Sequence, residues 1–326
     1  MGLDGEPFQT VTAVGMNDQA NPRRALPDDA VLDEWRAPDG FVLRRLTWAP
    51  KGASRGALLF AGGRGDFIEK YLEAYAYWRA DGWTVTTFDW RGQGRSRGDV
   101  RLGNYATFAG LIDDLAALIA DWRAASPEEP HIAIGHSMGG HLLLRTLVDK
   151  APALDAAVLV APMIRVNSYP MPGWLAPQIA EAMCLAGWRD ETVWKLDPAH
   201  SLAGGVRNRN LTSSAERYAD ELFWWEGEPE INIGPPSWGW LRAAYRSAAK
   251  TFTRAKLAKV TMPILIVATE RDRLVSADAI REAAALLPHA ELMMVPDAAH
   301  EILREADPIR LDALARIDAF LSGIGR

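Results

Sequence analysis

The sequence predicts an α/β protein with a mostly parallel sheet, helices on both faces of the sheet and an inserted, mainly helical segment. Short apolar runs alternate with segments that carry apolar residues at helical spacing. Most of these runs are continuously apolar, as expected for parallel strands that are covered on both faces. The chain has 326 residues, of which 48% are hydrophobic. That length is sufficient for one large α/β domain with an insertion.

The first half of the predicted core begins with a hairpin. Residues 1–30 are polar and are expected to wrap the surface, and residues 34–50 read as two strands joined at Asp39-Gly40, a strong turn signal. The runs that follow are either apolar and β-branched, as strands are, or place apolar residues on one helical face. In chain order they predict a strand over 56–63, a helix over 68–82, a strand over 83–90 and a helix over 108–122.

The second half of the core continues the alternation. An apolar run over 131–135 leads directly into a helical pattern, and three further buried strands are expected over 156–163, 262–269 and 291–296. The C-terminal helix is predicted to start with Asp307 as its N-cap and Pro308 at its first position.

One segment interrupts this alternation. Residues 165–255 contain several prolines and no clear strand, so we interpret them as a helical cap inserted into a core formed by residues 1–164 and 256–326. The segment carries seven of the thirteen tryptophans: Trp174, Trp188, Trp194, Trp224, Trp225, Trp238 and Trp240. Large aromatic side chains would hold a small cap together, and they would also suit an apolar substrate.

A five-residue pattern marks the junction between the strand over 131–135 and the helix that follows. Gly135-His136-Ser137-Met138-Gly139 matches G-x-S-x-G, in which the serine occupies a strained strand-to-helix turn. Bulky residues at 135 or 139 would collide with the backbone. The turn lifts the hydroxyl above the sheet, so we predict Ser137 as a nucleophile and not as an ordinary turn residue.

A serine nucleophile needs a base, which in this arrangement follows it in the chain. The candidates are His141, His200, His289 and His300. His141 lies one turn into the helix after the serine, His200 lies in the cap, and His289 precedes a strand at the wrong end of the sheet. His300 follows the strand over 291–296 at the carboxyl edge, where sites in such sheets form, so we predict it as the base.

The third member should be an acid that orients the histidine. The loop after the strand over 262–269 offers Glu270 and Asp272, and we favour Asp272 because it lies further into the loop. Asp297 is the alternative.

An oxyanion hole should complete the site with two backbone N–H groups. We expect them from Met138, directly after the serine, and from Arg64 in the glycine-rich loop after the strand over 56–63. This loop could also be a plain turn, but it lacks the Gly-Lys-Ser/Thr of a Walker A phosphate-binding loop.

Five motifs carry a resemblance to a known family. GGRGDFIEKYLE (62–73), FDWRGQGRSRG (88–98), GHSMGG (135–140), ATERDRLVS (268–276) and DAAHEILRE (297–305) resemble the α/β-hydrolase superfamily. The likeness is to the bacterial lysophospholipase L2 and monoacylglycerol lipase group of serine aminopeptidase S33-type hydrolases. The resemblance implies a triad of Ser137, Asp272 and His300, with the N–H groups of Arg64 and Met138 as the oxyanion hole. Many relatives carry His-Gly where this chain has Gly62-Gly63.

These observations predict hydrolysis of carboxylic esters of the lysophospholipid or monoacylglycerol type. Aminopeptidase, amidase, thioesterase and acyl-transfer activity remain alternatives, as does a non-catalytic ligand-binding protein of the same fold. The net charge of −6 gives no reason to expect nucleic acid as a partner. We expect no metal and no cofactor, because neither a ligand cluster nor a dinucleotide motif is present.

The remaining expectations concern the cellular setting. The single cysteine, Cys184, excludes an intrachain disulfide and favours a reducing compartment. No signal peptide or membrane-spanning run is recognised, so we predict a cytoplasmic protein. Transient peripheral contact of the tryptophan-rich cap with the inner membrane surface is a weaker hypothesis. The sequence does not indicate an oligomeric state.

Overall fold

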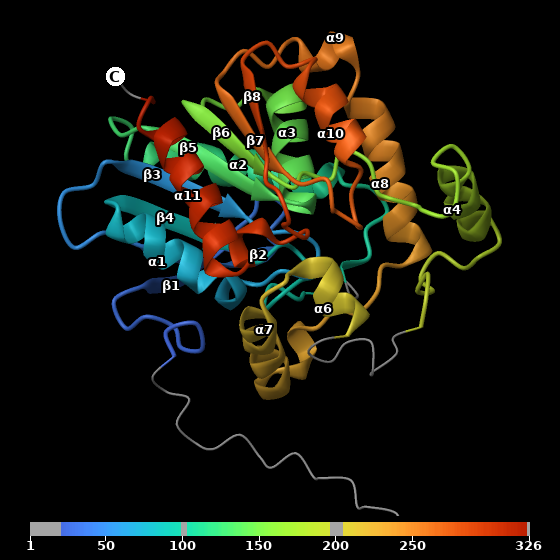
Figure 1. The fold of residues 1–326 in the computed structure, drawn as a ribbon, viewed down its shortest axis with the longest axis horizontal. Helices are drawn as coiled ribbons and strands as arrows, with labels where there is room; N and C mark the ends of the chain where they lie inside the picture. The colour runs from blue at the N-terminus through green and yellow to red at the C-terminus, as the bar shows by residue number, and fades with distance from the viewer. Residues whose placement is uncertain (1–20, 99–102, 196–204, 325–326) are drawn as a thin grey trace, which may run out of the picture.

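An eight-stranded sheet forms the centre of the structure, a computed structural model that describes residues 21–98, 103–195 and 205–324 (Figure 1). The strand order is β1-β2-β4-β3-β5-β6-β7-β8. The pairs β1–β2 and β2–β4 are antiparallel, and the other five pairs are parallel, which confirms the predicted sheet. The strands are β1 (Val31–Arg36), β2 (Val42–Trp48), β3 (Gly56–Ala61), β4 (Trp83–Phe88), β5 (His131–His136), β6 (Ala156–Val160), β7 (Ile264–Ala268) and β8 (Ala290–Met294).

Helices cover both faces of this sheet. Because neighbouring residues of a strand point to opposite faces, β3 sends Leu59 into one hydrophobic core, and Leu58 and Phe60 into the other. The first core is closed by α2 (Ala109–Ala124), α3 (Met138–Lys150) and α10 (Ala277–Ala284). The second is closed by the short helix η2 (Ile68–Tyr71), α1 (Leu72–Ala80) and α11 (Asp307–Leu321).

Two local expectations need correction. The strand β8 is only partly buried, because it is the last strand of the sheet and Glu291 and Leu292 are exposed. The helix α11 is capped by Ala306, so Asp307 is its first residue and not its N-cap. Most of the polar segment expected to wrap the surface, residues 1–20, lies outside the described residues.

Between β6 and β7 the chain forms helices, as expected. The described residues of 165–255 contain no strand and only isolated bridges. The helices are α4 (Ala176–Leu185), α6 (Val206–Leu211), α7 (Ala215–Gly227), η4 (Pro229–Ile231), α8 (Trp238–Thr251) and α9 (Arg254–Leu257). We call residues 165–255 the cap, although its separation from the core stays a prediction.

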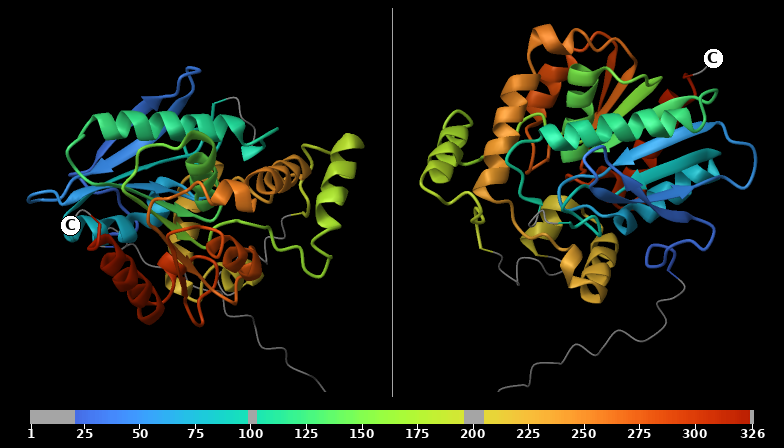
Figure 2. Two further views of the ribbon diagram at one scale, coloured as in Figure 1. Left: turned by 90° about the horizontal axis from the view of Figure 1, so that it is seen from above. Right: turned by 180° about the vertical axis from the view of Figure 1, so that it is seen from behind.

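The cap helices differ in how closely they join the rest of the molecule. The helix α8 packs against α3 and places Trp240, Ala243 and Ala244 in the first core. The helix α4 packs against α8 and stands at the edge of the molecule (Figure 2). Within the described ranges, none of the helices has the length and apolar character needed to cross a membrane.

Candidate active site

A strained turn joins β5 to α3 and presents Ser137. The backbone of Ser137 has φ 51° and ψ −114°, a conformation that L-residues rarely adopt. Its N–H donates to the Val160 carbonyl oxygen at 2.9 Å, and its own carbonyl oxygen accepts from His141 and Met163, each at 3.0 Å. These bonds from two neighbouring segments hold the turn in place.

The glycines around the serine are required by close backbone contacts. A Cβ at Gly139 would lie 2.1 Å from the Ala61 carbonyl oxygen, and a Cβ at Gly135 would lie 2.7 Å from Gly140 Cα. A Cβ at Gly63 would lie 3.1 Å from Ser137 Cβ. The loop after β3 and the turn after β5 are therefore packed directly against each other.

A continuous chain of hydrogen bonds runs from Ser137 to an acid. Ser137 Oγ lies 2.8 Å from His300 Nε2, and His300 Nδ1 lies 2.7 Å from Asp272 Oδ2. The second oxygen of Asp272 accepts the N–H groups of Leu274 and Val275 at 2.8 and 2.9 Å. With the carboxylate fixed in this way, the imidazole can take a proton from the serine hydroxyl, which then becomes a nucleophile.

The environment of His300 affects its proton affinity. His300 and Asp272 are both buried. Burial alone would lower the pKa of His300, but the carboxylate of Asp272 stabilises the imidazolium, and the pKa of His300 is raised above its ordinary value. This histidine is therefore a stronger base than a free one.

The other candidates of the sequence lie elsewhere. His141 is buried, with Nδ1 2.8 Å from the Met163 carbonyl oxygen and Nε2 2.6 Å from Ser247 Oγ, and burial lowers its pKa to about 4. His289 is exposed, and its carbonyl oxygen accepts from Ile264 at the start of β7, so it lies at the opposite end of the strands. His200 lies outside the described residues.

The two alternative acids also lie away from His300. Glu270 forms an exposed ion pair with Arg281, and Asp297 forms one with Arg271. Of the three acids considered, the structure brings only Asp272 to the imidazole.

The loop after β3 and the start of α3 each contribute one N–H group beside the serine. Neither the N–H of Arg64 nor that of Met138 has a hydrogen-bond acceptor among the described residues. The Arg64 guanidinium donates to the carbonyl oxygens of Gly234 and Pro235 at 2.8 and 2.9 Å. It thereby joins this loop to the cap, and burial lowers the pKa of Arg64 to about 10.

An aspartate that the sequence analysis missed fixes the same loop. Asp66 Oδ2 accepts the Gly63 N–H at 2.5 Å and lies 2.9 Å from His136 Nδ1. His136 is the residue before Ser137, and Tyr71 Oη also lies 2.9 Å from its Nδ1. The sequence shows an acid directly after a glycine-rich loop, but nothing in it indicates a partner 70 positions away.

A buried group of charged side chains lies beyond Asp66. We call Asp66, Lys70, Arg207, Glu221, Glu301 and Arg304 the charge cluster. Burial would raise the pKa of Glu221, but the three cations of the cluster lower it to about 2. Burial would lower the pKa of Lys70, but its carboxylate neighbours raise it above the usual value. Against the effect of burial, opposite charges likewise lower the pKa values of Asp66 and Glu301 and raise those of Arg207 and Arg304, so all six side chains are ionised at neutral pH.

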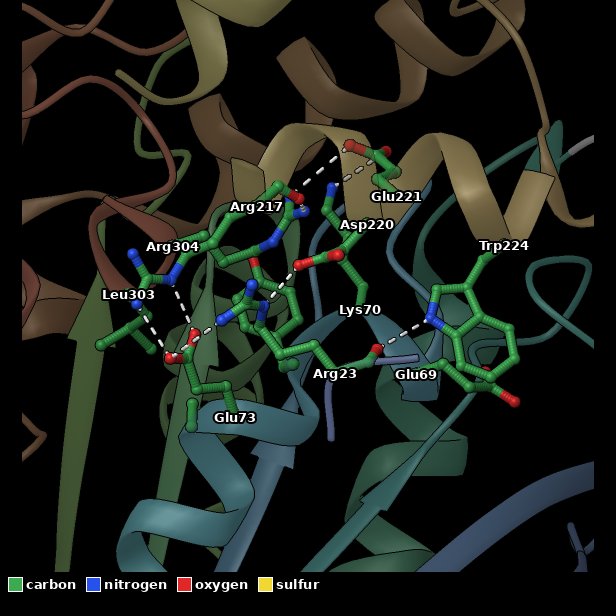
Figure 3. Close-up of a pocket in the computed structure, with 12 residues that line it drawn as sticks. Arg23, Glu69, Lys70, Glu73, Arg217, Asp220, Glu221, Trp224, Leu303 and Arg304 are labelled. Carbon is green, nitrogen blue, oxygen red and sulfur yellow. Dashed lines mark hydrogen bonds and ion pairs between the residues drawn. The ribbon is translucent and has the colours of Figure 1, made fainter. Parts of the chain in front are cut away.

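The charge cluster borders a small pocket that is lined mostly by charged residues. Figure 3 shows Lys70, Glu221 and Arg304 in this pocket, next to the ion pairs that Arg217 makes with Glu73 and that Arg23 makes with Asp220. In the described part of the chain, no group of three or more His, Cys, Asp or Glu side chains has the arrangement of a metal site.

The sequence of the chain is similar to those of known proteins. A family model described as "Serine aminopeptidase, S33" matches residues 52–307. The chain is 29% identical over 272 residues to lysophospholipase L2 of Escherichia coli K12, which covers 80% of this chain and 78% of that protein. It is 26% identical over 281 residues to the probable lysophospholipase L2 of Haemophilus influenzae, with coverage of 84% and 86%. It is 25% identical over 264 residues to a monoacylglycerol lipase of Mycolicibacterium smegmatis, with coverage of 80% and 86%.

Solved structures show a similar fold. A soluble variant of a monoglyceride lipase from Saccharomyces cerevisiae superposes with a TM-score of 0.72 at 18% identity, covering 94% of this chain and 99% of that one. A carboxyl esterase from Bacillus coagulans superposes with a TM-score of 0.68 at 18% identity, covering 90% and 98%. At such identities the likeness concerns the fold alone.

Proposed function

Because the chain belongs to the serine aminopeptidase S33 family and has the α/β-hydrolase fold, we propose that it is a serine hydrolase that cleaves carboxylic esters through an acyl-enzyme on Ser137. The observation that carries the proposal is the hydrogen-bonded chain from Ser137 through His300 to Asp272. The printed names of the relatives, lysophospholipase L2 and monoacylglycerol lipase, support an ester as the substrate.

The mechanism assigns one task to each group. Ser137 Oγ attacks the ester carbonyl carbon while His300 Nε2 takes the hydroxyl proton. The oxyanion that forms accepts the N–H groups of Arg64 and Met138, and Asp272 stabilises the imidazolium. His300 then donates the proton to the departing alcohol. Water repeats the sequence on the acyl-enzyme, so Ser137 is regenerated and a carboxylic acid is released.

A long acyl chain suits the surroundings of the site. A cavity of about 680 Å³ lies between α4, α8 and α10, and its lining includes Leu185, Phe252 and Leu286. It reaches Ile164, and the preceding residue, Met163, is hydrogen-bonded to the Ser137 carbonyl oxygen. Ser137, His300 and Asp272 are not among the described residues that line the cavity, so its use by the acyl chain of a lysophospholipid or a monoacylglycerol is part of the proposal.

The test is hydrolysis of p-nitrophenyl esters from acetate to palmitate. The proposal expects turnover that is highest for medium or long chains. Turnover of acetate and butyrate alone would indicate a small-ester esterase. Turnover of aminoacyl nitroanilides or acyl thioesters without ester turnover would favour the peptidase, amidase or thioesterase alternative. No turnover and no labelling of Ser137 by a fluorophosphonate would favour a non-catalytic ligand-binding protein.

The protonation of His300 predicts how the activity depends on pH. The base must be neutral to accept a proton, and its pKa in the folded enzyme is raised above the ordinary value of about 6.5. Activity should therefore be complete at alkaline pH and should fall as the pH drops through this raised pKa. The pH dependence of kcat/KM for p-nitrophenyl butyrate measures this fall in activity and gives its midpoint. A midpoint below that ordinary value would contradict the role of His300.

We also propose that the cap makes transient contact with a lipid surface. Of the ten exposed large hydrophobic side chains in the described residues, five lie in α4 or in the chain segments before and after it: Tyr169, Trp174, Leu185, Trp188 and Trp194. Exposed aromatic side chains in a segment that also lines an apolar cavity suit a protein that takes its substrate from a lipid surface. The cytoplasmic location stays a prediction.

Liposome co-sedimentation tests this contact. Replacing Trp174, Trp188 and Trp194 with serine should reduce the bound fraction several-fold and leave the turnover of soluble p-nitrophenyl acetate unchanged. The control is Leu311→Ser, which removes an exposed apolar side chain of α11. Equal liposome binding by the triple variant and the unchanged protein would contradict the proposed contact of the cap with a lipid surface.

A further inference from the structure

Buried ion pairs connect helix α7 of the cap to both halves of the site around Ser137. The connection is made by the charge cluster, in which three cations and three carboxylates face one another. Five of its six side chains are at least 95% buried, and Arg207 is 29% exposed. Charges at such depth are held in place by their partners, because water does not replace a lost contact.

The first route leads from α7 to the loop after β3. Glu221 Oε1 lies 3.3 Å from Lys70 Nζ, and Lys70 Nζ lies 2.8 Å from Asp66 Oδ1. The other oxygen of Asp66 accepts the Gly63 N–H and lies 2.9 Å from His136 Nδ1. Asp66 therefore ties the loop that carries the Arg64 N–H to the residue preceding Ser137.

The second route leads from the cap to His300. Lys70 Nζ also lies 2.6 Å from Glu301 Oε1, and Glu301 directly follows His300. The backbone supports the same segment, because the N–H groups of His300 and Glu301 donate to the carbonyl oxygens of Asn210 and Leu211 at 3.4 and 2.7 Å. Asn210 and Leu211 are the last two residues of α6.

Glu221 is the residue of the cap that contacts both routes. It is fully buried and contacts all three cations of the cluster: Arg207 of α6 at 2.7 Å, Lys70 at 3.3 Å and Arg304 at 3.5 Å. Arg304 in turn pairs with Glu301. Without the Glu221 carboxylate, Lys70 loses the partner that holds its ammonium group between Asp66 and the cap.

We propose that Glu221 is a positioning residue for the hydrolysis reaction. Through Lys70 it holds Asp66, which fixes the loop after β3 that carries the Arg64 N–H. Through Lys70 and Arg304 it also holds Glu301, which fixes the position of His300. This inference rests on the serine hydrolase proposed above. If Glu221 has this role, contact between the cap and the core is needed for the correct geometry of the reacting groups, in addition to lining the substrate site. Small displacements of such groups reduce rates strongly.

The test is the rate at which a fluorophosphonate labels Ser137. This rate depends on the positions of the nucleophile and the oxyanion hole, and it can be measured without knowing the natural substrate. Glu221→Gln keeps the shape of the side chain and removes its charge. We expect the second-order labelling rate to fall about tenfold, a small part of what complete loss of an oxyanion-hole donor costs. The kcat for p-nitrophenyl acetate should fall equally, with KM unchanged.

The matched control is Asp220→Asn in the same helix. Asp220 is also buried, but it pairs with Arg23 and Arg24 of the N-terminal segment and does not contact the charge cluster. The labelling rate of this variant should equal that of the unchanged protein. An equal loss in both variants would overturn the inference, because any loosening of the cap would then have the same effect.

A double variant separates positioning from the presence of an unpaired buried cation. Lys70→Met with Glu221→Gln removes one charge of each sign, so the net charge of the cluster is unchanged and Asp66 keeps its contact with His136. We therefore expect the double variant to fold even if the single variant does not, and circular dichroism checks this. Slow labelling of the double variant supports the inference. If the double variant or Glu221→Gln is labelled at the rate of the unchanged protein, the inference is overturned. If the unchanged protein is not labelled, the serine hydrolase proposal fails instead.

Discussion

Replacing Ser137 with alanine is expected to reduce kcat for p-nitrophenyl butyrate by as much as about 10⁶-fold, the scale seen when a triad serine is removed. The hydroxyl at 2.8 Å from His300 Nε2 is the protein group that forms the covalent bond to the acyl carbon in the proposed mechanism. The variant should fold normally, because the turn is held by the backbone bonds of residue 137. Steady-state kinetics, with circular dichroism as a check of folding, measure the effect.

A second serine–histidine pair provides a control for this variant. Ser247 Oγ lies 2.6 Å from His141 Nε2, but His141 Nδ1 faces the Met163 carbonyl oxygen and no acid among the described residues, and burial lowers its pKa to about 4. Ser247→Ala should therefore retain ester hydrolysis. Retained activity in Ser137→Ala, or its loss in Ser247→Ala without loss of fold, would contradict the assignment of the nucleophile.

Replacing Asp272 with asparagine is expected to reduce kcat about 10⁴-fold. The amide oxygen can still accept the N–H groups of Leu274 and Val275, so the loop should keep its shape. The amide nitrogen would then face His300 Nδ1 as a donor. This holds the proton on Nε2, the nitrogen that must accept the serine proton, so the base is in the wrong tautomer.

Asp297→Asn is the matched control for the acid. Its carboxylate forms an exposed ion pair with Arg271, which contributes little to the site or to stability. The variant should retain nearly full kcat. The assignment of the acid would be contradicted if Asp297→Asn lost activity and Asp272→Asn kept it.

The order of strands and helices could be predicted from the sequence because it depends on local periodicity. Continuous apolar runs indicated the parallel strands, and the strand-to-helix motif around Ser137 predicted the turn that the structure contains. The partial exposure of β8 could not be predicted in this way, because its apolar residues look like those of a central strand. Only the strand order reveals that no other strand of the described residues pairs with its outer edge.

The sequence also indicated the candidates for the site but not the contacts that hold them. Chain order and loop position selected His300 and Asp272, which the structure brings together. By contrast, no distinctive sequence pattern marks Asp66 and Glu221, because the sequence does not distinguish a buried acidic residue from an exposed one. Their roles depend on partners as far as 151 positions away, as for Glu221 and Lys70, which only tertiary packing brings into contact.

The central claim is a covalent acyl-enzyme on Ser137, and the most direct measurement is to trap it. We would quench the reaction with p-nitrophenyl butyrate in acid within the first turnover, and determine the mass of the protein and of its peptides. The account predicts a mass increase of a single butyryl group in the peptide that contains Ser137. Ester hydrolysis without an adduct, or with the adduct on another residue such as Ser247 or Cys184, would contradict it.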